Sequence, residues 1–387
     1  MKKLRVCVVT GTRAEFGIWR PVLRAIQQSP RLELQLVVTG MHLLQGFGTT
    51  VQDIEDSGLP IAARVPMYRD TPGKNPEADA ARSLARGIDG LAAACRQLQP
   101  GLVMLLGDRL EMLAAACAAL AQRLPIAHLH GGETAPGIWD EQIRHAITKM
   151  AHLHFCATRR ARQRIVRMGE EPARVHLVGA PALDLALGFL DEAEETARLD
   201  RRERGVSPVL VLHPSGGDEA TEYKRAKLVL GVLKKVFPGD GRVTVVGPNN
   251  DPGHRGIVRA YSEQPHGLAL ALSLSQEGFW SQMMTGGLLV GNSSSGIIEA
   301  ASMGVPVVNI GDRQAGRERN VNVIDVGWNA AEIEKALRRV LTDKCFARQV
   351  VRRKNIYGDG HASERTVAVL EKIAREGIAL EKRFVDR

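Results

Sequence analysis

Aromatic side chains and cysteines are scarce in this sequence of 387 residues. Phe, Trp and Tyr together make up 4% of the chain, so it offers few of the aromatic surfaces on which proteins stack single-stranded nucleic acid. The five cysteines are scattered, with no Cys-x-x-Cys pair and no Cys/His spacing of the zinc type. We therefore expect reduced thiols in a cytoplasmic protein that has no structural metal site.

Long apolar segments are also missing. No run reaches the roughly 18 apolar residues that a membrane-spanning helix needs, and the apolar run after the basic start is too short for a signal peptide. The formal net charge is +9, with arginine runs at residues 159–167, 201–204 and 352–354. We interpret these separate runs as solvated faces, and we expect neither nucleic acid nor a membrane as a partner.

The length and the hydrophobic content of 44% predict about two domains, each with its own core. Short apolar runs alternate with amphipathic segments along most of the chain, which indicates an α/β fold with parallel strands and helices on both faces. We expect strands at residues 4–10, 34–39, 60–68, 102–106, 126–129, 153–157, 175–178, 209–212, 243–246, 268–272, 288–290 and 306–310.

A change of character near residues 189–206 marks the expected domain boundary. The segment is acidic at residues 191–195 and then basic, and the strand–helix alternation restarts after it. We predict a first domain over residues 1–190 and a second over residues 206–363. We also expect loops at residues 40–50 and 70–77 and a terminal amphipathic helix over residues 364–383. The simplest arrangement packs the two halves face to face around a cleft.

Ionisable residues gather just after two neighbouring strands of the first half. The carboxyl ends of parallel strands are where open α/β sheets bind ligands, and such groups can act as acids and bases at neutral pH. Asp108 and Asp140 could instead cap helices, since Glu111 stands three residues after Asp108. The density of the set favours a site over caps. Its members are Asp108, Arg109, Glu111, His128, His130, Glu133, Asp140, Glu141, Arg144 and His145.

Two further loops have the composition of anion sites. Residues 11–17, GTRAEFG, join a strand to a helix, where free helix N–H groups bind phosphate. The lettering is neither GxGxxG nor Walker A, so neither NAD nor ATP is indicated. Arg13 could clamp a phosphate or be a surface arginine. Ser293 and its neighbours begin a helix expected over residues 297–303, and Glu299 one turn in suits ribose hydroxyls or a helix dipole.

Five segments resemble the hydrolysing UDP-N-acetylglucosamine 2-epimerases of sialic and legionaminic acid biosynthesis, which supply cell-surface polysaccharides. The segments are GTRAEFG, GMHLLQGFG, GDRLEM, HLHGGETAPGIWDEQIRHAITKMAHLHF and VGNSSSGIIEAASMGVPVVNIGDRQAGRERNVNV, and the similarity runs from about residue 4 to residue 327. The resemblance implies two Rossmann-like domains facing a cleft, the GT-B type. It also implies that the C-terminal helix, with residues 364–387, crosses back to the first domain. It further implies a homodimer or homotetramer.

The resemblance also assigns roles to residues. It implies that UDP lies mainly on the second domain and that Asp108 and Asp140 occupy catalytic positions. Many sialic-acid members read H-x-E-G-G-E where this chain has His128-Leu129-His130, and some legionaminic-type members share the histidine. His130 or Glu133 is then the third acid–base candidate. The implied UDP contacts are Arg13, His213, Asn249, Ser293, Ser294, Gly296, Glu299 and Arg313.

The expected reaction converts UDP-N-acetylglucosamine into N-acetylmannosamine and UDP, by anti elimination of UDP and hydration of a 2-acetamidoglycal. It needs no redox cofactor and no metal, because the C2 hydrogen leaves as a proton. The same chemistry on UDP-N,N′-diacetylbacillosamine stays open, as does a non-hydrolysing epimerase. A glycosyltransferase on the same fold and a non-catalytic nucleotide-sugar sensor are the alternatives from other classes.

Overall fold

The computed structural model describes residues 3–44, 50–69, 76–134, 139–190, 205–239, 243–249, 251–263, 268–271 and 274–386. Parts of three predicted features lie outside these residues. They are the loop at 40–50, the loop at 70–77 and the linker at 191–204.

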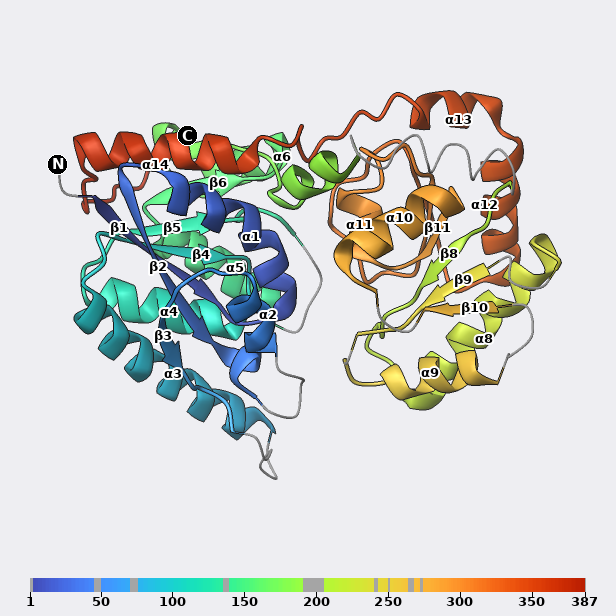
Figure 1. The fold of residues 1–387 in the computed structure, drawn as a ribbon, viewed down its shortest axis with the longest axis horizontal. Helices are drawn as coiled ribbons and strands as arrows, with labels where there is room; N and C mark the ends of the chain where they lie inside the picture. The colour runs from blue at the N-terminus through green and yellow to red at the C-terminus, as the bar shows by residue number, and fades with distance from the viewer. Residues whose placement is uncertain are drawn as a thin grey trace. The chain divides into compact units, whose positions relative to one another are not determined.

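The chain forms two compact units (Figure 1). The first comprises Met1–Asp184 together with Tyr357–Arg387, and the second comprises Leu185–Ile356. The first unit therefore contains the end of the chain as well as its beginning, while the predicted first domain extended to residue 190.

The first unit is built on a seven-stranded parallel sheet with the order β3-β2-β1-β4-β5-β6-β7. All neighbouring strands pair in parallel, as their continuous apolar sequences predict. The strands are β1 (Leu4–Thr10), β2 (Leu32–Thr39), β3 (Ile61–Val65), β4 (Leu102–Leu106), β5 (Ile126–Leu129), β6 (Leu153–Cys156) and β7 (Val175–Leu177).

Helices cover both faces of this sheet. Successive side chains of β1 point to opposite faces, so Val6 and Val8 join one core cluster with Trp19, while Cys7 and Val9 join another. The helices are α1 (Arg13–Gln28), α2 (Thr50–Asp56), α3 (Pro76–Leu98), α4 (Leu110–Ala121), α5 (Asp140–Met150), α6 (Arg159–Arg167) and α14 (Ala362–Glu376).

The C-terminal helix α14 belongs to the first unit, where it packs beside α1 and β2 (Figure 1). Its Leu370 is fully buried in the same core cluster as Trp19. The predicted return of the chain to the first domain is confirmed. The predicted length of the helix is wrong, because α14 ends at Glu376 rather than at residue 383. Gly377 follows with φ +78°, a conformation that favours glycine and stops the helix.

The second unit repeats the topology with six parallel strands in the order β10-β9-β8-β11-β12-β13. Like the first six strands of the first unit, these follow the 3-2-1-4-5-6 order of Rossmann-like sheets, which confirms the predicted fold class. The strands are β8 (Val209–Val211), β9 (Val243–Val246), β10 (Leu268–Ala271), β11 (Leu289–Gly291), β12 (Val307–Ile310) and β13 (Val323–Val326). The helices are α8 (Glu219–Val236), α9 (His254–Ser262), α10 (Gln276–Gly286), α11 (Ser294–Ile298), α12 (Ala330–Thr342) and α13 (Lys344–Val350).

Four elements of the second unit differ from the sequence predictions. Strand β13 and helices α9 and α13 were not expected. The helix expected over residues 297–303 is instead the five-residue α11, which begins within the serine run. The dipole of this short helix is weaker than that of a long one, so the predicted anion site depends more on the serine hydroxyls than on the helix N-terminus.

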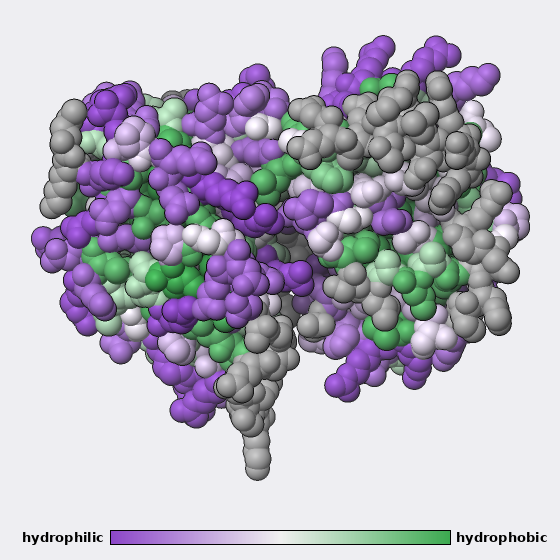
Figure 2. Space-filling view, viewed as in Figure 1, coloured by the Kyte–Doolittle hydropathy of each residue, from purple (hydrophilic) through white to green (hydrophobic). Residues whose placement is uncertain are grey.

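Hydrophilic side chains cover most of the face drawn in Figure 2, and hydrophobic ones appear there in separate groups. In the part of the chain that the structure describes, no helix is long and apolar enough to cross a membrane.

Candidate active site

The order of each sheet reverses at one point, and ligands of open α/β sheets bind outside the strand ends there. In the first unit this point lies between β1 and β4, which lead into Gly11 and Gly107. In the second unit it lies between β8 and β11, which lead toward His213 and Asn292. The predicted site residues follow these strands and their neighbours.

Arg144 holds together the loops that follow β4 and β5. Its guanidinium, 5% exposed, donates through Nη2 to the Asp108 carboxylate and through Nη1 to the carbonyl oxygen of His130, over 3.1 Å. Asp108 is not a cap, because the N-cap position of α4 is Arg109 and carries no side-chain capping bond. The structure thus favours the site interpretation of Asp108 over the capping one.

His130 and Glu133 form a buried pair beside this ion pair. His130 has φ +59°, a left-handed conformation that costs a non-glycine residue about 1–3 kcal/mol and persists where the surroundings enforce it. Its Nδ1 lies 2.5 Å from Glu133 Oε1, and its Nε2 is buried with no hydrogen-bond partner among the described residues. One ring nitrogen is therefore held by a carboxylate, while the other has its hydrogen-bonding capacity unused among the described residues.

Asp140 is the first residue of α5 and lies one turn before Arg144 on the same helix face. The N-cap is Trp139, so Asp140 is not the capping residue. Burial raises the pKa of Asp140, and the positive charge of Arg109 opposes that shift. The structure therefore brings all four predicted catalytic residues, Asp108, His130, Glu133 and Asp140, to the neighbourhood of Arg144.

A second group of charges lies under the loops after β1 and β2. Glu111 is fully buried, and added Cβ atoms at Gly11 and Gly40 would lie 2.9 Å and 2.6 Å from its side chain. Burial and the neighbouring Glu111 raise the pKa of Glu15 to about 8. Arg109 Nε pairs with Glu111 Oε2 at 3.3 Å and so offsets the buried negative charge. Glycines at these two loop positions leave the room that the Glu111 side chain occupies.

Three backbone N–H groups of the first loop are already engaged. The N–H groups of Gly11 and Thr12 donate to Glu15 Oε2 over 2.7 Å and 3.1 Å, and Glu15 N donates to Thr12 Oγ1. This capping box occupies part of the donor set that the phosphate interpretation relied on. Arg13 points outward with 66% of its side chain exposed, and its Nε lies 3.3 Å from Asp53 Oδ2.

In the second unit, Asn292 connects the loops after β8 and β11. Its Oδ1 accepts from His213 N over 2.7 Å, and its Nδ2 donates to His213 O over 2.8 Å. Gly291, with φ +130°, makes this possible, since a Cβ there would lie 1.9 Å from the carbonyl oxygen of Val211. Asn292 therefore fixes the backbone on both sides of His213.

The imidazole ring of His213 is uncharged and keeps one N–H group that can donate a hydrogen bond. Burial and the nearby Arg313 lower its pKa to about 4, and its Nδ1 accepts a hydrogen bond from Asn249 N over 3.0 Å. The proton of the neutral ring is then on Nε2. Arg313 Nη1 donates to Asn292 O over 3.3 Å. The predicted residues His213, Asn249 and Arg313 are thus brought together around Asn292.

The serine run and Glu299 lie at the ends of α11. Ser293 is the N-cap, with its Oγ accepting from Ser295 N over 3.4 Å, and Ser294 and Gly296 belong to the helix. Glu299 is buried, and its Oε2 accepts from Trp280 Nε1 over 2.7 Å. Part of the Glu299 carboxylate is therefore already engaged within the protein.

Sequence reasoning gave no separate role to two residues that organise these sites, Arg144 and Asn292. Arg144 was only one of a dense set, although its i, i+4 spacing from Asp140 places both on one helix face. Asn292 stands between a strand and the serine run, and the predicted anion site rested on the serines rather than on Asn292. Among the residues that the structure describes, no group of three or more His, Cys, Asp or Glu side chains could hold a metal ion.

Comparison with known proteins identifies the family. A family profile described as UDP-N-acetylglucosamine 2-epimerase matches residues 24–371. The chain is 35% identical to the UDP-N,N′-diacetylbacillosamine 2-epimerase (hydrolysing) of Legionella pneumophila, over 98% of each chain. It is 31% identical to the UDP-N-acetylglucosamine 2-epimerase of Neisseria meningitidis, over 99% of each chain.

Solved structures of similar proteins share the fold. The UDP-GlcNAc 2-epimerase from Neisseria meningitidis bound to UDP-GlcNAc matches with a TM-score of 0.80 at 19% identity, over 95% of this chain and 100% of that one. The MnaA–UDP structure from S. aureus matches with a TM-score of 0.80 at 19% identity, over 100% of each chain. At this identity the likeness concerns the two-domain Rossmann-like architecture.

Proposed function

The chain belongs to the UDP-N-acetylglucosamine 2-epimerase family, and from this premise we propose that it is a hydrolysing enzyme. It removes UDP from a UDP-2-acetamido sugar and releases the free sugar with inverted configuration at C2. The observation that carries the proposal is the cluster of Asp108, His130, Glu133 and Asp140 around one buried arginine, Arg144.

The first step is an elimination. A base removes the C2 proton while the bond between C1 and the diphosphate oxygen breaks, so the electron pair of the C–H bond forms the C1–C2 double bond. The products are a 2-acetamidoglycal and UDP. Negative charge develops on the leaving diphosphate, where cations and hydrogen-bond donors lower the barrier. Arg313, the neutral His213 and the hydroxyls of Ser293 and Ser294 are the candidates for that role.

The second step adds water across the double bond. Oxygen bonds to C1 and a proton returns to C2 from the opposite face, so the step needs an acid placed across the ring from the base. Asp108, Asp140 and the His130–Glu133 pair supply ionisable groups at the ends of three elements. We assign the acid–base work to these groups as a set, without giving base and acid to individual residues.

We place UDP on the second unit. The proposed contacts are those that the family resemblance implies. The geometry supports them, because His213 and Arg313 both bond to Asn292 and Asn249 N donates to His213. Arg13 is the proposed contact from the first unit, since its exposed pair with Asp53 is of a kind worth only about 0–1 kcal/mol and is easily exchanged for a phosphate. Gly296 and Glu299 complete the set.

Two sugars are candidates. UDP-N-acetylglucosamine is the substrate that the family description names. The identity of 35% to the Legionella diacetylbacillosamine enzyme, against 31% to the Neisseria enzyme, favours UDP-N,N′-diacetylbacillosamine as the second candidate. His130 supports the same choice, since some legionaminic-type members have this histidine. A cytoplasmic location and a homodimer or homotetramer stay predictions.

The test is to incubate the purified protein with each UDP-sugar and to follow the C1 and C2 signals by NMR together with free UDP. The proposal predicts free UDP and a free 2-epimeric sugar. A product that keeps UDP attached would indicate a non-hydrolysing epimerase. Turnover only with an added acceptor would indicate a glycosyltransferase, and binding without turnover a sensor.

A further inference from the structure

The second half of the HLHGGETAPGIWDEQIRHAITKMAHLHF segment takes no part in the proposed chemistry. Asp140 and Arg144 occupy the first half of α5, whereas Thr148 and Lys149 lie in its last turn and His154 on β6. Lys149 and His154 pair with Glu170, and the carbonyl oxygen of Thr148 accepts from Lys382 in the extended tail that follows α14.

Glu170 is the centre of this arrangement. Its side chain is 2% exposed and lies 2.5 Å from Lys149 Nζ, 3.0 Å from His154 Nε2 and 2.8 Å from Lys382 Nζ. Burial opposes its ionisation, but the hydrogen bonds from His154 and the two lysines outweigh that effect and lower its pKa to about 2. A buried carboxylate with three donors therefore anchors a lysine from the end of the chain.

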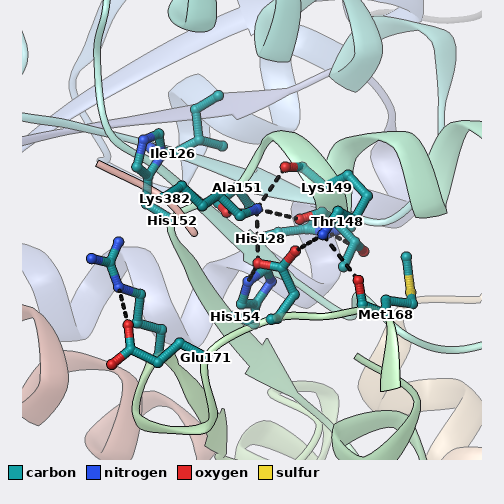
Figure 3. Close-up of polar contacts among 12 residues, drawn as sticks. Ile126, His128, Thr148, Lys149, Ala151, His152, His154, Met168, Glu171 and Lys382 are labelled. Atoms are coloured by element: carbon teal, nitrogen blue, oxygen red, sulfur yellow. Dashed lines mark hydrogen bonds and ion pairs between the residues drawn. The ribbon is translucent and has the colours of Figure 1, made fainter. Parts of the chain in front are cut away.

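Lys382 also caps α5. Its Nζ donates to the carbonyl oxygens of Thr148, Lys149 and Ala151, over 3.4 Å, 2.5 Å and 2.6 Å (Figure 3). The last carbonyl groups of a helix have no partner within the helix, and the helix dipole favours a positive charge at that end. One ammonium group thus serves both the buried Glu170 and the open end of α5.

The tail is held on both sides of Lys382. Before it, Arg174 Nη1 and Nη2 donate to the carbonyl oxygens of Ala379 and Glu381, each over 3.1 Å. After it, the Phe384 ring packs against Gly169 and under the Lys149 ammonium, which lies 5.0 Å from the ring centroid. These contacts fix the direction from which the Lys382 side chain reaches Glu170 and the end of α5.

A hydrogen-bonded path leads from the capped turn to the loop of Asp108. Thr148, whose carbonyl oxygen accepts from Lys382, places its Oγ1 3.2 Å from His128 Nδ1. His128 Nε2 lies 2.7 Å from the carbonyl oxygen of Gly107. Burial lowers the pKa of His128 to about 3, so the neutral ring gives its one proton to the carbonyl oxygen of Gly107. The Thr148 hydroxyl itself donates to the carbonyl oxygen of Arg144 over 2.9 Å. Gly107 directly precedes Asp108.

We propose that Lys382 is a positioning residue for the reaction proposed above: it fixes the C-terminal end of α5, so that Asp140, Arg144 and the Asp108 loop keep their reactive geometry. The inference rests on the proposed function. Its physical basis is that α5 is a short rigid rod whose two ends move together. A displacement of about 1 Å at the reacting groups can cost on the order of a hundredfold in rate.

The experiment compares Lys382→Met with Arg383→Gln in the full-length protein. The methionine keeps the unbranched stem of Lys382 and removes its charge and donors. Arg383 is the matched control, because it is the next residue, carries the same charge, is 82% exposed and contacts only Glu381 among the described residues. Phe384→Ala is the second variant. It loosens the tail at a ring that is itself 65% exposed and so leaves the core intact.

We expect Lys382→Met to lower kcat roughly tenfold, with KM changed less than about twofold, because the lost interaction acts on the transition state. Arg383→Gln should match the unchanged protein and Phe384→Ala should lie between them. Amide hydrogen exchange over residues 140–150 should quicken in Lys382→Met, less so in Phe384→Ala, and not in Arg383→Gln. A kcat equal to that of Arg383→Gln would overturn the inference, even if the melting temperature fell.

Two further outcomes keep this test separate from that of the function. If Lys382→Met does not fold, the kcat of Phe384→Ala becomes the test, and an unchanged kcat in that variant overturns the inference. If the unchanged protein releases no UDP from either sugar, the proposed function fails instead. Amide exchange then still measures whether Lys382 holds α5, and equal exchange in Lys382→Met and Arg383→Gln would show that it does not.

Discussion

Arg144 and Asp108 form a partly buried ion pair across 36 positions of sequence, between the middle of α5 and the loop after β4. The pair fixes one proposed catalytic carboxylate relative to the helix that carries another, Asp140. Through its bond to the carbonyl oxygen of His130, Arg144 also fixes the loop after β5. Two loops and the helix that carries Asp140 thus depend on one guanidinium group.

Replacing this guanidinium should therefore damage both stability and turnover. We expect Arg144→Met to lower kcat by about a hundredfold, because the loops after β4 and β5 lose their common support. It should also lower the free energy of unfolding by about 3 kcal/mol, because Asp108 is left without its partner. Arg144→Lys should recover little of either, since an ammonium group cannot reach both oxygens as the planar fork does. Denaturant unfolding and steady-state kinetics measure the two effects.

Replacing the carboxylate itself should separate binding from chemistry. Asp108→Asn keeps the shape of the side chain and removes its charge and basicity. We expect turnover to be lost while UDP binding, measured by calorimetry, changes little, because the proposed UDP contacts lie mainly on the second unit. A parallel loss of UDP affinity and turnover would contradict this division of roles.

Removing the positive charge of Arg109 should shift the pH dependence of activity. Burial raises the pKa of Asp140, and Arg109 opposes the rise. Without Arg109 the pKa of Asp140 rises further, so more of it is protonated at a given pH. The acidic limb of the kcat/KM profile of Arg109→Gln should therefore move to higher pH if Asp140 must be ionised. Arg82→Gln, an exposed arginine on α3, is the control and should leave the profile in place.

The tail anchor should contribute to stability in a pH-dependent way. The pKa of Glu170 is lowered from 4.5 to about 2, so its ionised form stabilises the folded state above pH 4.5. That contribution is lost as the pH falls from about 4.5 toward 2. Glu170→Gln should melt at a lower temperature than the unchanged protein at pH 7, and the difference should shrink across that window. A difference that stays constant down to pH 2 would contradict the assigned role of Glu170.

The sequence predicted the layers of the fold because these depend on local patterns. The valine-rich run of β1 and the glycine loop after it are examples, and so are the apolar positions of α1. Two features that were not predicted nevertheless have local signals in the sequence. Gly377 is a signal for the end of the terminal helix, but the amphipathic pattern continues beyond it and the predicted helix was too long. Thr12 and Glu15 have the spacing of a capping box, which was not predicted.

Other features could not be read from the sequence, because they join residues that are distant along it. The capping of α5 by Lys382 spans more than 200 residues, and the bonds between Asn292 and His213 span 79. Nothing in the local pattern of Lys382 distinguishes it from Arg383, which points to solvent. His130 and Glu133 were candidates because they follow a predicted strand within a dense set of ionisable residues, but the left-handed backbone of His130 was not expected.

The most direct measurement of the central claim, that C2 loses its proton as UDP leaves C1, is NMR of the reaction in deuterated water. The account predicts deuterium at C2 of the released sugar in every turnover, together with one free UDP for each sugar. Released sugar that retains its original hydrogen at C2 would contradict it, because UDP would then have left by a route that does not break the C2–H bond.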